Sequence, residues 1–208
     1  MLALNTGRQA VERALSHLAE ARQFNDRTTE ESDQASRAVD GYRPALRAIE
    51  FDRNDRDVSE HGRTIRRIAG QAADRGEVAA AAQARSESLL AQLDEALEEA
   101  LAATQGNTRV QSRLLSARHD ILFAIDSCHT IEVCLHHGTS ALGDRLDPYL
   151  NEVEEDMPGR DVGRFAESIE ELLLDGRQRL GSGKLFGQSV ARSLLSAEQY
   201  LVAARDAL

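Results

Sequence analysis

Apolar residues recur at steps of three and four along most of the chain, which is the spacing of one face of an α-helix. The first such stripe starts at Val11 and predicts a helix from Asn5 to about Asp40. Gly41 can adopt the left-handed conformation that ends a helix. A second helix is then expected from Pro44 to about Gln105, with proline in its first turn.

Each of these two expected helices contains a stretch with few apolar residues, and the two stretches flank the same turn. They are residues 25–36 and 50–64. Paired antiparallel, they would form the charged tip of a long helical hairpin that projects from a better packed body. Gly62, Gly70 and Gly76 each weaken a helix by about 1 kcal/mol relative to Ala, so a broken or disordered tip is the alternative.

A third helix is expected from Thr108, as its N-cap, to His137, with Gly138 as its end. Its apolar residues cover much of the circumference. Leu114 and Ile121 lie on one side, and Leu115 and Leu122 lie on another. A helix that is apolar nearly all round belongs in the middle of a bundle.

Three shorter helices are expected in the remainder of the chain. One begins at Asp147-Pro148 and reaches about Asp156. Asp161 caps the next, and the turn Gly181-Ser182-Gly183 ends it, while the last helix starts near Leu185.

These patterns predict an all-α fold, a multi-helix bundle of about five or six helices with a long N-terminal antiparallel helical hairpin. Residues 1–105 would form a coiled-coil-like hairpin with a charged tip, and residues 106–208 a helical bundle packed against its base. The two parts are expected to form one continuous domain, since 208 residues can bury one sizeable core.

Composition narrows the classes of function. Hydrophobic residues make up 41% of the chain and aromatic residues only 4%, which favours helices over a β-sandwich or barrel. The formal net charge of −10 argues against a general nucleic-acid binder or a binder of anionic membranes, because both would repel the chain. No apolar run is long enough to cross a bilayer.

The cysteines and the N-terminus bear on localisation. Cys128 and Cys134 lie six residues apart on one expected helix, about 120° apart around its axis, so they cannot form a disulfide with each other. The segment Met1–Ala10 has no basic start followed by a long apolar stretch, so no secretory signal is expected. Two unpaired thiols and no export signal predict a cytoplasmic protein.

A histidine-rich stretch on the third helix is the main candidate for chemistry. Asp126, His129, Glu132 and His136 follow at steps of three, three and four, so they share one stripe about 120° wide. Imidazole and carboxylate groups bind transition metals, and the four residues are therefore a candidate metal site. The alternative is that these side chains are satisfied by neighbouring polar groups or lie on a partly exposed edge.

Other chemical patterns are incomplete. His119-Asp120 is a dipeptide used by all-helical metal-dependent phosphohydrolases, but such a site would also need His61 and Asp144 as ligands. The pair Glu152 and Glu155 has the spacing of Mg²⁺-binding acidic pairs in helical pyrophosphohydrolases, although a solvated helix face explains it as well. Residues 181–184 resemble only part of a phosphate loop, and we interpret them as a turn between helices.

The leading functional hypothesis is a non-enzymatic cytoplasmic helical scaffold, adaptor or assembly subunit that acts through protein–protein contacts. It rests on the long Ala/Leu seam from Ile65 to Leu101, which needs a partner helix along its whole length. A protein partner or self-association into a homo-oligomer could provide it, and no cofactor is expected. The alternative is a metal-dependent helical-bundle enzyme or sensor that holds a transition metal ion on the third helix. A small-ligand sensor with an apolar pocket along that helix is a third possibility.

Overall fold

The computed structural model describes residues 2–51, 58–155 and 161–208, and every regular element in these ranges is helical. Four helices are long, whereas two are short and two are single 3₁₀ turns. They are α1 (Leu2–Ala38), η1 (Val39–Tyr42), α2 (Arg43–Phe51), α3 (Val58–Ala103), α4 (Thr108–Leu142), α5 (Asp147–Glu154), η2 (Gly163–Phe165) and α6 (Ala166–Arg205). The predicted all-α bundle is thus confirmed, but it is built on four long helices and not on five or six.

The chain divides into two compact units, and each unit takes one segment from every long helix. Unit 1 comprises residues 1–29, 81–132 and 185–208, and unit 2 comprises residues 30–80 and 133–184. Both units therefore combine residues from the first and the second half of the chain.

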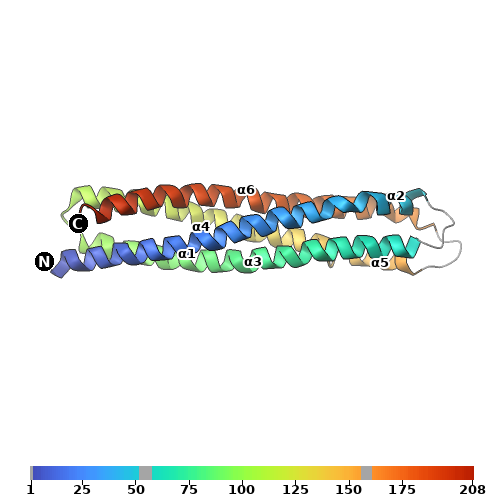
Figure 1. Cartoon of the computed structure of the whole chain (residues 1–208), viewed down its shortest axis with the longest axis horizontal. Helices are drawn as coiled ribbons and strands as arrows, with labels where there is room; N and C mark the ends of the chain where they lie inside the picture. The colour runs from blue at the N-terminus through green and yellow to red at the C-terminus, as the bar shows by residue number, and fades with distance from the viewer. Residues whose placement is uncertain (1, 52–57, 156–160) are drawn as a thin grey trace. The chain divides into compact units, whose positions relative to one another are not determined.

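Unit 1 is an antiparallel bundle of four helical segments. Figure 1 shows both termini and the α3–α4 connection at one end of this unit, so successive long helices alternate in direction. Polar contacts join neighbouring segments. Arg13 of α1 pairs with Glu99 of α3, Arg118 of α4 with Asp94 of α3 at 2.7 Å, and Arg113 of α4 donates to the carbonyl oxygen of Ala203 on α6. Asn25 Nδ2 of α1 donates to the carbonyl oxygen of Gly187 on α6 at 3.0 Å, which closes the ring of helices.

A buried polar layer crosses the core of unit 1. Asn25 and Gln83 are buried almost completely, and the Gln83 amide lies close enough to the Cys128 thiol to lower its pKa. Asn25 Oδ1 and both polar atoms of the Gln83 amide make no hydrogen bond of ordinary geometry. An unpaired buried amide costs about 1–3 kcal/mol, so this layer is a local weakness in an otherwise Ala/Leu-rich core.

Unit 2 has the same neighbour relations, but two of its arms are broken into shorter helices. The end of α1 continues through η1 into α2, and the end of α4 continues into α5. Arg66 of α3 bonds to Asp147, Asn151 and Glu154 around α5, with its Nε 2.8 Å from Glu154 Oε1. Lys184 Nζ of α6 lies 2.9 Å from Asp33 Oδ1 on α1.

The predicted charged hairpin tip is wrong for residues 25–36. Asn25, Thr28 and Ser32 are fully buried, because their small polar side chains fit where helices approach closely. Thr28 bonds back to the carbonyl oxygen of Phe24, which satisfies its hydroxyl within the helix. The second expected helix is also divided: α2 ends at Phe51, and residues 52–57 lie outside the described part of the chain.

Two predicted helix ends are wrong because the glycines serve close packing and not termination. The helix α4 continues through Gly138 to Leu142, and a Cβ added at Gly138 would lie 3.0 Å from Leu180 Cγ. The helix α6 likewise continues through residues 181–183 without interruption, so the predicted interhelical turn is absent there. The predicted end of the fourth helix near Asp156 lies outside the described residues.

The start of α4 also differs in detail from the prediction. Asn107 and not Thr108 is the capping residue, since Asn107 Oδ1 accepts a hydrogen bond from the backbone N–H of Val110 at 3.2 Å. Gly106 has a φ of 94°, which ordinary L-residues rarely adopt, and this allows the sharp α3–α4 connection.

Candidate functional site: the outer side of α4 and α6

The four candidate metal ligands do not converge in the described structure. His129 and Glu132 are 74% and 62% exposed, and their nearest atoms, Nδ1 and Oε2, lie 3.4 Å apart. Asp126 is also exposed, whereas His136 belongs to the segment of α4 in unit 2. Among the residues that the structure describes, no group of three or more His, Cys, Asp or Glu side chains is placed to hold a metal ion. The metal site stays a prediction from sequence spacing.

The His119-Asp120 dipeptide and the partial phosphate loop at residues 181–184 can both be located in the structure. His119 and Asp120 lie in unit 1, while His61 and Asp144 lie in unit 2. Lys184, the cation of the partial phosphate-loop pattern, lies inside α6 and pairs with Asp33. The hydrogen bond from Lys184 holds the pKa of the Asp33 carboxyl below its ordinary value, which is the behaviour of a stabilising ion pair.

Burial disfavours the thiolate form of both cysteines. Burial raises the pKa of Cys128 to about 11, with the Gln83 amide opposing part of this effect. Burial also raises the pKa of Cys134, against a smaller opposing effect of Arg179. Since the thiolate is the reactive form, both cysteines are expected to act as packing residues.

A surface of exposed apolar side chains distinguishes α4 and α6 from the other two helices of unit 1. Leu115, Leu122 and Phe123 of α4 are 56%, 45% and 52% exposed. The large apolar side chains exposed on α6 in unit 1 are Leu185, Phe186, Leu195 and Tyr200. Within residues 5–29 of α1 and 81–103 of α3, no large apolar side chain is exposed. The prediction that α4 is buried on all sides is therefore wrong.

We call Leu115, His119, Leu122, Phe123 and Asp126 the α4 face. All five residues are exposed, and they lie within about 100° around the helix axis. The spacing of Leu115 and Leu122 is part of the apolar pattern that predicted a helix in the middle of a bundle, since apolar steps look the same whether a stripe meets the protein interior or solvent.

A shallow hollow joins the α4 face to α6. Leu115, Ser116, His119 and Asp120 of α4 and Tyr200 of α6 line it, with a volume of about 330 Å³. Asp120 Oδ2 is buried and has no hydrogen-bond partner. The hollow therefore places polar groups of His119 and Asp120 beside the apolar Leu115.

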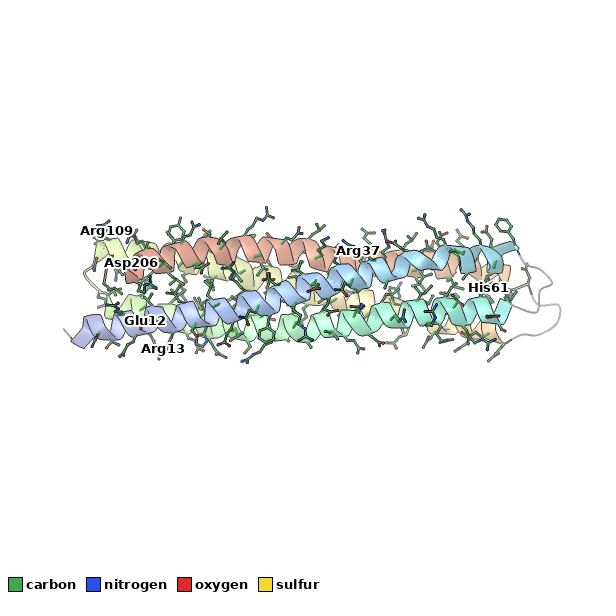
Figure 2. All side chains as sticks on the ribbon, in the orientation of Figure 1. Glu12, Arg13, Arg37, His61, Arg109 and Asp206 are labelled. Atoms are coloured by element: carbon green, nitrogen blue, oxygen red, sulfur yellow. The ribbon has the colours of Figure 1, made fainter. Side chains whose placement is uncertain are left out.

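The outer surfaces of α1 and α3 are charged instead. Figure 2 shows Glu12 and Arg13 directed outward from α1, and Arg13 pairs with Glu99 across to α3. Arg118 bridges Asp94 and Glu98 where α4 meets α3, and its hydrogen bond to Asp94 raises the pKa of the guanidinium. Exposed ion pairs of this kind contribute little stability but keep a surface hydrated.

No protein-family model matches the sequence, and a search of curated proteins found no significant match. None of the described helices combines the length and apolar character needed to cross a membrane.

Proposed function

We propose that the chain is a non-enzymatic helical scaffold or adaptor protein of the cytoplasm, which acts through a protein–protein contact made by the α4 face. The observation that carries this proposal is that, within residues 5–29, 81–132 and 185–208 of unit 1, the exposed large apolar side chains lie on α4 and α6. Two thiols in the reduced state fit a cytoplasmic setting.

The energetic argument concerns Leu115, Leu122 and Phe123. Burying a whole Leu or Phe side chain contributes about 1.5–3 kcal/mol, and roughly half of each of these side chains is exposed. Covering the three together would thus contribute a few kcal/mol, at about 1 kcal/mol each. Exposed large apolar side chains gathered on one side of a helix are a feature of protein interaction sites.

The proposal is tested by measuring the size of the complexes that contain the protein in extracts of the cells that make it. The test variant is Leu122→Ser/Phe123→Ser, which removes the two adjacent apolar side chains at the centre of the α4 face. The matched control is Ala91→Ser/Gln92→Ser, which changes two adjacent exposed residues of α3. Both variants are first checked for unchanged helix content and unfolding temperature.

Size-exclusion chromatography of the extracts should place the wild-type chain and the α3 control in the same complexes. The α4 variant should elute at the size of a free 208-residue chain. If all three proteins elute identically, or the wild-type chain is free at its cellular concentration, the proposed function is wrong.

A further inference from the structure

The α4 face has an internal symmetry that points to its partner. The midpoint between Leu122 and Phe123 is also the midpoint between His119 and Asp126 along the helix. A two-fold axis through this midpoint would place an antiparallel copy of α4 so that Leu122 of one copy meets Phe123 of the other and His119 meets Asp126, while Leu115 meets Thr130. We propose, resting on the function above, that the partner of the α4 face is a second copy of this chain in this register.

Hydrogen-bond complementarity selects the register. Asp126 offers a carboxylate acceptor and His119 an imidazole N–H donor, and the two residues would face each other in two symmetric contacts across the axis. Moving the two copies so that Asp126 meets Asp126 would place like charges together, and pairing Asp126 with Leu122 would bury a carboxylate against an apolar group. Both of these alternatives are unfavourable, because a desolvated carboxylate needs a partner.

The apolar centre fits the same arrangement. Leu122 and Phe123 are both about half exposed, so two copies would form a four-residue apolar cluster directly on the axis. The His119–Asp126 contacts would lie about 5 Å along the helix on either side of the axis. A self-complementary patch of this kind is what a two-fold dimer requires.

A charge swap can prove that the contact is between copies. Within one chain, His119 and Asp126 are seven residues apart, which is about 10 Å along the helix, so they cannot pair directly. His119→Glu alone would place a carboxylate against Asp126 across the axis, and Asp126→Arg alone would remove the acceptor of the His119 N–H and place a guanidinium there. The double variant His119→Glu/Asp126→Arg places opposite charges in both symmetric contacts.

The experiment is sedimentation velocity of the purified full chain over a wide concentration range at low salt. The wild type should form a dimer. Each single variant should raise the dissociation constant of the dimer about tenfold or more, and the double variant should bring it back most of the way to the wild-type value. Asp26→Arg is the matched control, since it makes the same charge change at an exposed position of α1 and should dimerise like the wild type.

A strictly monomeric wild type would overturn the proposal of a second copy, while the proposed function would survive if the α4 face still determines complex size in extracts. The register would be overturned if both single variants dimerise with the wild-type dissociation constant. It would also be overturned if the double variant dimerises no more tightly than the single variants. If the Leu122→Ser/Phe123→Ser variant behaves as the wild type in extracts, the proposed function itself has failed.

Discussion

Two glycine-to-alanine substitutions in unit 2 test the close packing of α4 and α6. Gly70 lies within α3, and a Cβ added there would meet no atom within 4 Å. Gly176 lies within α6, and a Cβ added there would come 2.5 Å from Leu142 Cγ and 2.6 Å from Leu142 Cδ2. Leu142 is buried, and the carbonyl oxygen of Gly138 lies only 3.2 Å from the same Cβ, so neither neighbour can easily move away.

The same chemical change should therefore have opposite effects. Alanine is favoured over glycine in a helix by about 1 kcal/mol, so Gly70→Ala should raise the free energy of unfolding by about this amount. Overpacking a full core costs about 1–3 kcal/mol. With a rigid neighbour the upper end applies, and after the helix gain is subtracted Gly176→Ala should lower the free energy of unfolding by about 2 kcal/mol.

Urea unfolding followed by circular dichroism measures both free energies. A third variant, Gly176→Ala combined with Leu142→Ala, makes room for the new methyl group. Gly176→Ala should lower the free energy of unfolding less when Leu142 is already Ala than in the wild type, and the difference is the coupling energy between the two sites. If Gly176→Ala stabilises the protein as much as Gly70→Ala does, α4 and α6 do not approach each other as closely as described and the reasoning fails.

Four further measurements test other parts of the structure. Gln83→Leu should raise the free energy of unfolding by about 1–2 kcal/mol, because it removes a buried unpaired amide; a loss of stability in urea titrations would show that this amide is hydrogen-bonded. Cys128 should stay unmodified by a thiol reagent at pH 8 until the chain is unfolded, given its pKa of about 11, and rapid labelling of folded protein would contradict its burial. The pKa of Asp33 is depressed by Lys184, so this ion pair stabilises the fold above the ordinary carboxyl value of 3.8 and is lost as the pH falls below it; Lys184→Met should flatten the acid side of the stability profile, and an unchanged profile would argue against the pair. The metal hypothesis requires a stoichiometric transition metal in protein purified without chelators and its loss in His129→Ala, so metal retained by that variant would rule out this residue as a ligand.

Helix type and approximate position were predictable along most of the chain because apolar spacing is a local property. The start of α4 near residue 108 and the start of α5 at Asp147 follow from capping and proline signals, which are also local. Helix ends at glycine were not predictable in the same way. Gly138 and the glycines at 181–183 resemble stop signals in the sequence. In the structure, the absence of a side chain at these positions lets a neighbouring helix pack closely.

The exposed position of the α4 face could not be obtained from its pattern. Leu115, Leu122 and Phe123 have the spacing and hydrophobicity of core residues, and the helix also has a second apolar stripe that includes Leu114 and Ile121. A helix with two apolar stripes can bury both or only one, and the number and placement of its neighbours decide between these outcomes. In unit 1, the contacts of α4 with α3 and α6 cover the stripe of Leu114 and leave the other stripe outside.

By itself, the sequence determined that this protein is helical, acidic and poor in aromatic residues, because composition and local periodicity act residue by residue. Only the tertiary structure decided which polar residues are buried and which apolar residues are exposed. Asn25 and Gln83 lie in the core of unit 1 although they are polar, while Phe123 lies outside although it is apolar. The physical reason is that burial depends on what packs against a side chain, and that neighbour comes from a distant part of the chain.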